Sequence, residues 1–173
     1  CINAFVVIYG NLLRVEGMGA YFAVYAGCLL ATRPLFGSLS DKYGVQRIIP
    51  IGLCFFVASI LVLTLASSLS LFLLAAVIGA CGYGAVIPLL QSLGFLCSPY
   101  DARGAASNTT FFGLDAGNLV GPTIGGMMVS LFVASGASEV QSYNGMFFVL
   151  IMPVLIAFIV FLMARKTIMK PTE

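Results

Sequence analysis

Long apolar runs, interrupted only by short polar turns, dominate this 173-residue chain. They cover about residues 18–38, 48–66, 71–95, 105–134 and 143–164, and a shorter run covers residues 1–10. A helix needs roughly 20 apolar residues to cross a bilayer, so the five long runs predict membrane-spanning helices and the first run does not. Only 8% of the residues are charged, against about 25% in soluble domains. We therefore predict an all-α membrane protein, a helical bundle of five full transmembrane helices plus one partial helix.

Composition also excludes several classes of function. The formal net charge is +2 and histidine is absent. Nucleic-acid binding needs a clustered basic face, so we expect no nucleic-acid partner and the lipid bilayer as the surroundings. Histidine is the usual metal ligand and general base, and the five cysteines form no C-x-x-C pair. We expect no metal, no cofactor and no enzyme.

The most charged turn of the chain lies between the first two long runs. Residues 33–47 read RPLFGSLSDKYGVQR. Gly37 and Gly44 suit sharp backbone direction and close approach, and Asp41 is followed by the basic residues Lys42 and Arg47. This pattern predicts a short loop over residues 37–47 at a membrane surface, joining two antiparallel helices.

The same pattern, R-P-x-x-G-x-L-x-D-x-x-G followed by a basic residue, resembles the loop signature of the major facilitator superfamily of transporters. In that family the loop joins the second and third helices of each six-helix half. The resemblance implies a cytoplasmic gating motif that latches electrostatically in one state, made of Arg33, Gly37, Asp41, Lys42, Gly44 and Arg47. The alternative is that any tight cytoplasmic turn between membrane helices tends to carry glycine and basic residues.

The apolar run 105–134 has two different faces. Four glycines recur every four residues, a ridge that lets another helix approach closely: Gly113, Gly117, Gly121 and Gly125. A different face gathers Asn108, Phe111, Asp115, Asn118 and Pro122. Residues 117–126, GNLVGPTIGG, resemble the G-x-x-x-G-P-x-x-G-G signature of the family's antiporters. That signature belongs to the fifth helix of the first half, so here it marks either half or their internal repeat.

Asp115 is the candidate for a proton or substrate site. It lies about 15 Å into its helix, and an ionisable group at such depth is a functional hypothesis by default. The other candidates are polar side chains: Asn118, Asn108, Gln91, Tyr21 and Tyr25. In the structural alternative, Asp115 pairs with Arg33 or bonds to the two asparagines. The tyrosines share a helical face with Cys28 and Thr32, and hydrogen bonding between helices explains that face equally well.

Basic residues predict the orientation. With the loop around Asp41 inside, only Arg14 falls outside, and six basic residues fall inside: Lys42, Arg47, Arg103, Arg165, Lys166 and Lys170. The positive-inside rule then predicts a multi-pass protein of the plasma (inner) membrane whose tail, residues 165–173, is cytoplasmic. The run 71–95 lacks the arginine of the family's first-half signature. We therefore expect the C-terminal six-helix half, with its first helix truncated and a missing N-terminal half as partner.

The resemblance implies a secondary active transporter of a small molecule. Its motifs are most similar to those of proton-coupled exporters of drugs or metabolites, which work by alternating access. Two alternatives come from other classes: a membrane sensor or binding protein that moves nothing, and a scaffold half that needs a separate partner chain. The deep acid favours transport over sensing, because a receptor needs no titratable group within the membrane.

Overall fold

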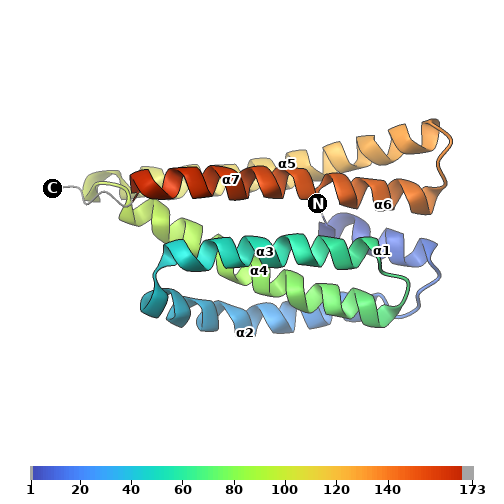
Figure 1. Ribbon diagram of the computed structural model, residues 1–173, viewed down its shortest axis with the longest axis horizontal. Helices are drawn as coiled ribbons and strands as arrows, with labels where there is room; N and C mark the ends of the chain where they lie inside the picture. The colour runs from blue at the N-terminus through green and yellow to red at the C-terminus, as the bar shows by residue number, and fades with distance from the viewer. Residues whose placement is uncertain (1, 169–173) are drawn as a thin grey trace.

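The computed structural model describes residues 2–168, and the side chains of residues 2–164, as an all-helical bundle (Figure 1). Its elements are α1 (Ile2–Leu12), α2 (Gly19–Tyr43), α3 (Val45–Thr64), α4 (Leu69–Leu96), the 3-10 turn η1 (Tyr100–Ala102), α5 (Arg103–Ala134), α6 (Glu139–Val149) and α7 (Ile151–Ile168). Five segments are long and apolar enough to cross a membrane: α2, α3, α4, η1 with α5, and α6 with α7. The described residues thus confirm the predicted fold class, with α1 as the short helix.

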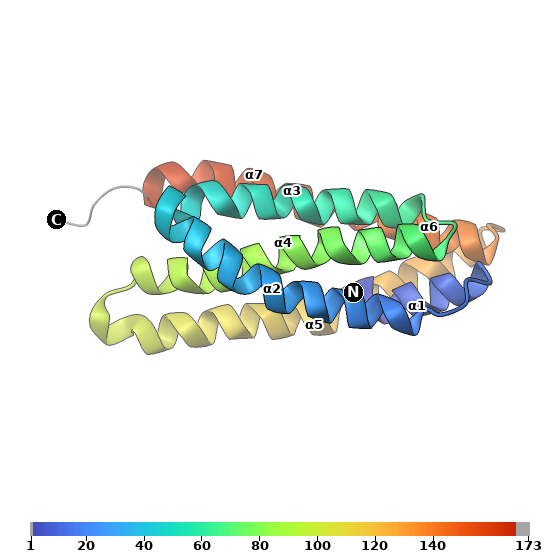
Figure 2. The ribbon, with the colours of Figure 1, turned by 90° about the horizontal axis from the view of Figure 1, so that it is seen from below.

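Successive spans run in opposite directions along one long axis. The α2–α3 and α4–α5 joints lie at the same end as the last turn of α7, and the α1–α2, α3–α4 and α5–α6 joints lie at the opposite end (Figure 1). In that view α5, α6 and α7 run along one side of the bundle and α2, α3 and α4 along the other. Figure 2 shows the same rods from a perpendicular direction, with α4 between α3 and α5.

Two apolar clusters pack the two ends of the bundle. One joins α1, α2, α3, α4 and α6 and includes the fully buried rings of Tyr9, Phe72 and Phe147. The other joins α2, α3, α4 and α7 around residues such as Ile49 and Leu89. Both clusters draw on α2, α3 and α4, so these three helices form the continuous framework of the bundle.

The joint between α2 and α3 is much shorter than the loop predicted over residues 37–47. Helix α2 continues through Asp41 to Tyr43, and α3 begins at Val45. Only Gly44 leaves helical geometry, with φ at +86°, a conformation that glycine adopts without steric cost. Its N–H donates to the Ser40 carbonyl at 2.8 Å and so closes the last turn of α2. The motif therefore forms the end of a helix, a single-residue joint and the start of the next helix.

The last span, expected as one helix over residues 143–164, is two helices. The interruption lies at Leu150, between α6 and α7, three residues before Pro153. Proline has no N–H to donate to the carbonyl of Val149, and its ring crowds that carbonyl. A capping box of Ser138 and Gln141 starts α6 four residues earlier than expected. Lys170 and the end of the predicted tail lie outside the described residues, as do the side chains of Arg165 and Lys166.

Close helix packing depends on the glycines of α4 more than on the predicted ridge in α5. A Cβ on Gly82 would lie 3.0 Å from the backbone oxygen of Gly52 and 3.0 Å from the backbone nitrogen of Phe56. A Cβ on Gly113 or Gly117 would have no neighbour within 4 Å. For these two positions of α5 the predicted close contact is absent among the described residues. The reason is that this side of α5 faces away from the bundle.

Candidate functional site

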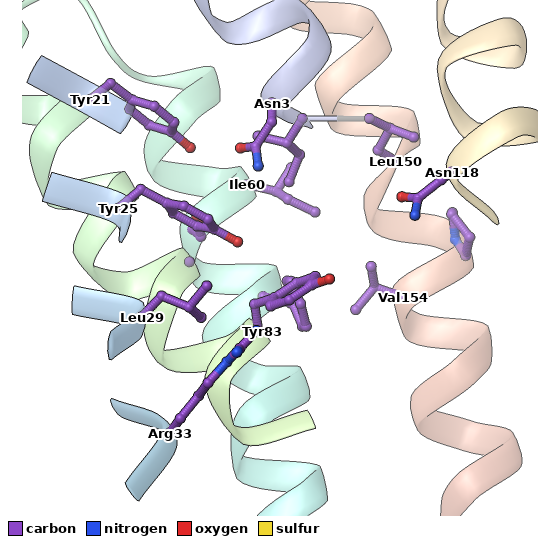
Figure 3. Close-up of a pocket in the computed structure, with 15 residues that line it drawn as sticks. Asn3, Tyr21, Tyr25, Leu29, Arg33, Ile60, Tyr83, Asn118, Leu150 and Val154 are labelled. Carbon is purple, nitrogen blue, oxygen red and sulfur yellow. The ribbon is translucent and has the colours of Figure 1, made fainter. Parts of the chain in front are cut away.

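A cavity of about 530 Å³ lies between the two packed ends of the bundle. Six helices contribute to its wall, and Figure 3 shows it at close range. Its lining is Ile2, Asn3, Tyr21, Tyr25, Leu29, Arg33, Phe56, Ser59, Ile60, Gly79, Tyr83, Asn118, Leu150, Pro153 and Val154. Ile2, Asn3 and Tyr21 lie near the starts of α1 and α2, and the other lining residues lie near the middle of their spans. The cavity therefore reaches the mid-depth of the bundle.

One face of α2 supplies four lining residues at a constant spacing of four: Tyr21, Tyr25, Leu29 and Arg33. Residues four apart lie above one another on a helix. The predicted polar face included Thr32 in place of Arg33. In the structure Thr32 is buried against α4 and donates to the Ala80 carbonyl at 3.3 Å. The face of α2 that lines the cavity is therefore rotated slightly from the predicted face, and its last residue is the charged Arg33.

Two aromatic pairs form much of the apolar wall. Tyr21 and Tyr25 are stacked, with ring centroids 6.2 Å apart and planes 7° apart. Phe56 of α3 and Tyr83 of α4 meet edge to face at 6.4 Å and 77°. Stacked and edge-to-face arrangements are the favoured ones for aromatic rings. The cavity thus offers ring faces and edges together with phenolic hydroxyl groups.

Polar groups reach the cavity from several helices. Figure 3 shows Tyr21 and Tyr25 extending from α2 toward Asn3 of α1, with Asn118 of α5 on the opposite side. Tyr25 lines the cavity together with Asn3, Tyr83 and Arg33. Hydroxyl and amide groups both donate and accept hydrogen bonds. The site can therefore hold a polar ligand without a fixed requirement for donors or acceptors.

The wall between α3 and α4 depends on a serine–glycine contact. Ser59 is buried and its Oγ donates to the Ala75 carbonyl at 2.9 Å. A Cβ on Gly79 would lie 2.8 Å from that Oγ and 3.8 Å from Cε2 of Tyr25. A glycine at this position brings α4 close to both α3 and the tyrosine stripe, and so sets the depth of the cavity.

Arg33 is the charged member of the lining. It was predicted near the membrane surface as part of the gate, but α2 continues for ten residues beyond it, or about 15 Å. Figure 3 shows its side chain extending from α2 toward Tyr83. Arg33 is exposed within this chain and lines the cavity.

The other predicted residues divide into two groups. Tyr21, Tyr25 and Asn118 line the cavity, whereas Asp115 and Asn108 lie on the exposed side of α5 and Gln91 is half-buried in α4 outside the lining. The charged residues of the motif, Asp41, Lys42 and Arg47, are exposed at the α2–α3 end of the bundle. There the ammonium of Lys42 lies 5.4 Å from the ring centre of Tyr43.

Sequence reasoning missed Asn3 and Tyr83 as lining residues. Asn3 belongs to the short first run, and Tyr83 lies among the glycines of α4. Both are single polar side chains in apolar runs, which was the available signal. Their convergence on α2 depends on which helices meet, and no local pattern encodes that. Within the described residues, no group of three or more His, Cys, Asp or Glu side chains could hold a metal ion.

The sequence of this chain is similar to those of known proteins. The family model described as Major Facilitator Superfamily matches residues 3–172. The chain belongs to the major facilitator superfamily. The motif-based resemblance is thereby confirmed, and the family consists of transporters, not enzymes. With its apolar helices, this family member is a multi-pass membrane protein.

Two relatives illustrate the similarity. Multidrug resistance protein 3 of Bacillus subtilis (strain 168) is 30% identical over 125 residues, which cover 69% of this chain and 24% of that protein. Quinolone resistance protein NorA of Staphylococcus aureus is 31% identical over 121 residues, which cover 69% of this chain and 31% of that protein. The matched part of this superfamily chain is thus a quarter to a third of the length of these relatives.

Proposed function

We propose that the chain is one six-helix half, the C-terminal one, of a secondary transporter that exports drugs or metabolites by alternating access. The observation that carries the proposal is the cavity between two packed ends. Transporters of this kind bind substrate near the bilayer midplane and rock two helical bundles around it. A volume of about 530 Å³ with a largely apolar wall suits a drug-sized molecule.

The relatives support the substrate class. One is described as a multidrug resistance protein and the other as a quinolone resistance protein. Aromatic pairs and adaptable hydroxyl and amide groups are a suitable wall for varied aromatic compounds. We infer a transporter of drug-like or metabolite-like organic molecules in the plasma membrane.

The exposed polar face of α5 supports a second half as partner. Asn108 and Asp115 are exposed within this chain, although their helix belongs to an apolar span. A carboxylate within a span faces protein or a water-filled cavity and avoids lipid. We infer that this face of α5 meets the aqueous centre of the transporter, opposite an N-terminal six-helix half.

Asp115 is the proposed proton carrier. Viewed along α5 it lies about 60° around the helix from Asn118, which lines the cavity. An acid beside the substrate site can couple proton entry to substrate release. The alternative keeps Asp115 as a packing residue that bonds to groups of the second half.

The exposed charges at the α2–α3 joint are the proposed gate. Asp41, Lys42 and Arg47 extend from the end of the bundle, where they are free to latch against the other half in one state. Lys42, Arg47 and Arg103 lie at this end and Arg14 at the other. The positive-inside rule therefore assigns the gate and the end of α7 to the cytoplasm.

The test is proton-coupled flux in the full-length protein that contains these residues. We would reconstitute it in proteoliposomes and follow lumenal pH while drug-like compounds are added. The expected result is a substrate-dependent proton flux that is lost in Asp115→Asn. A matched control is Asn108→Asp in the Asp115→Asn background, because Asn108 lies on the same exposed face; partial return of flux would support a proton carrier on this face.

Other results separate the alternatives. Flux that survives Asp115→Asn moves the coupling group to the second half and leaves Asp115 a packing residue. Ligand binding without any flux would favour the sensor that transports nothing. Flux only after a separately encoded half is supplied would favour the scaffold half.

A further inference from the structure

We propose that Arg33 makes the cavity selective for aromatic molecules that carry a carboxylate. This inference rests on the proposed transport function and names the chemical class of its substrate. It assigns Arg33 to ligand recognition rather than to the cytoplasmic gate. The ring binds among the tyrosines and the carboxylate binds the guanidinium.

Among the residues that the structure describes, the wall of the cavity carries a positive charge without a negative one beside it. Arg33 carries a positive charge, and the described lining contains no acid. Asp41 lies eight residues farther along α2, about 12 Å along the helix axis, at the exposed end. Asp115 lies outside the lining on α5. The positive charge of Arg33 is therefore not neutralised within the cavity and attracts an anion.

The planar shape of the Arg33 guanidinium favours a carboxylate. Its planar fork matches a carboxylate through two parallel hydrogen bonds, and such charge-assisted pairs are stronger than neutral ones. Apolar walls lower the local dielectric and strengthen the attraction. The same field repels an ammonium ion. A cation of equal size is thus a poorer ligand than an anion at this position.

The aromatic residues of the wall favour a ligand with a flat ring. Tyr25 lies eight residues before Arg33 on the same face of α2, so about 12 Å of wall separates their backbones. The stacked Tyr21–Tyr25 pair and the Phe56–Tyr83 pair flank that distance. A flat ring fits this wall better than a flexible acyl chain, because ring faces and edges are already in place. The wall and the charge together specify an aromatic carboxylate.

Binding of one matched ligand pair tests the proposal. The full-length protein would be placed in nanodiscs of phosphatidylcholine, and affinity for nalidixic acid and for its primary carboxamide would be measured by equilibrium dialysis. We expect the acid to bind at least about tenfold more tightly than the amide, as one charge-assisted hydrogen-bonded pair provides. Arg33→Gln should reduce this ratio to near one, because the charge-assisted pair with the acid is lost.

Two further variants separate charge from fold. Arg33→Lys keeps the charge and loses the planar fork, so the preference for the acid should be intermediate. Arg103→Gln removes an exposed arginine that lies over Tyr100 at 5.2 Å, far from the cavity lining, and should keep the full ratio. If Arg33→Gln does not fold, the wild-type ratio and the Arg33→Lys ratio still decide.

Equal binding of acid and amide in the wild type would overturn the proposal, as would a ratio that survives Arg33→Gln. A second result would also overturn the proposal. If added phosphatidylglycerol displaces the acid from the wild type, and Arg33→Gln abolishes this displacement, Arg33 binds a lipid headgroup. The transport proposal fails separately: it requires flux of some compound, including neutral or cationic ones. If the protein transports a cation and binds the acid no more tightly than the amide, the proposed role of Arg33 is refuted and the transport proposal stands.

Discussion

Helices α4 and α5 are of similar length and both are rich in glycine, yet they are used in opposite ways. Half of the most apolar 18-residue window of α4 is buried, against 6% of that of Tyr100–Ala134. In α4 the glycines admit neighbouring backbones, whereas Gly113 and Gly117 of α5 have no neighbour within 4 Å. Helix α4 is therefore the centre of this bundle, whereas α5 is a wall whose outer side is available to lipid or to another part of the protein.

Leucine substitution should separate the two helices most clearly. Gly82→Leu in the full-length protein places a Cβ against the backbones of Gly52 and Phe56, which cannot move without separating α3 from α4. We expect the free energy of unfolding to fall by about 3 kcal/mol, or the protein not to fold, as for severe overpacking. The measurement is the fraction of monodisperse protein that remains after heating in detergent.

The matched control is Gly113→Leu, at a position with open space around it. It should leave thermal stability near that of the wild type. If Gly113→Leu costs as much as Gly82→Leu, the predicted glycine ridge of α5 packs against another part of the full-length protein. The contrast between the two helices would then be a property of this half alone.

Cysteine labelling should show which side of α5 faces water. Asp115→Cys and Val120→Cys would be compared in a background without other cysteines. Both native side chains are exposed, and they lie five residues, or about 140° around the helix, apart. A water-soluble thiosulfonate needs the thiolate, which forms in water and not in lipid. We expect Asp115→Cys to react at least about tenfold faster, because a carboxylate in a span avoids lipid.

Equal and slow labelling at both positions would place the two sides of α5 in the same apolar surroundings. The aqueous wall proposed for Asp115 would then be lost. Faster labelling at Val120→Cys would reverse the assignment of the two sides. Protection of Asp115→Cys by a transported ligand would place this side of α5 next to the ligand.

The sequence predicted the helices well and their joints less well. Hydropathy located the five spans, because a membrane helix must satisfy its own backbone and present apolar side chains. It placed a loop at residues 37–47, but Asp41 and Lys42 are compatible with a helix and only Gly44 has a positive φ. It predicted a kink at Pro153, but the effect falls upstream at Leu150, because proline disturbs the carbonyl four residues earlier.

The candidate site was predictable only where one helix encodes it. Tyr21 and Tyr25 share a face of α2, and Asn118 is polar in an apolar run, so local patterns identified them. The position of Arg33 could not be derived from its motif, since its depth depends on how far α2 continues beyond it. Tyr83 and Asn3 join the site through the crossing of helices, which is a tertiary property.

The smallest expected difference compares two serines. Ser59→Ala removes a hydroxyl that donates from α3 to the Ala75 carbonyl of α4 at 2.9 Å. Hydrogen bonds between membrane helices contribute about 0.6 kcal/mol on average, so we expect a loss of that order. The measurement is unfolding of the full-length protein with SDS in mixed micelles, followed by circular dichroism.

Ser130→Ala is the matched control, because Ser130 is exposed and donates at 3.1 Å to the Gly126 carbonyl of its own helix, α5. That carbonyl remains available to the helix when the hydroxyl is removed, and no second helix loses a partner. The variant should therefore unfold as the wild type does. An equal loss in both variants would mean that a serine hydroxyl stabilises its own helix as much as it joins two, and that the cohesion of the α3–α4 pair comes from glycine-mediated contact without help from Ser59.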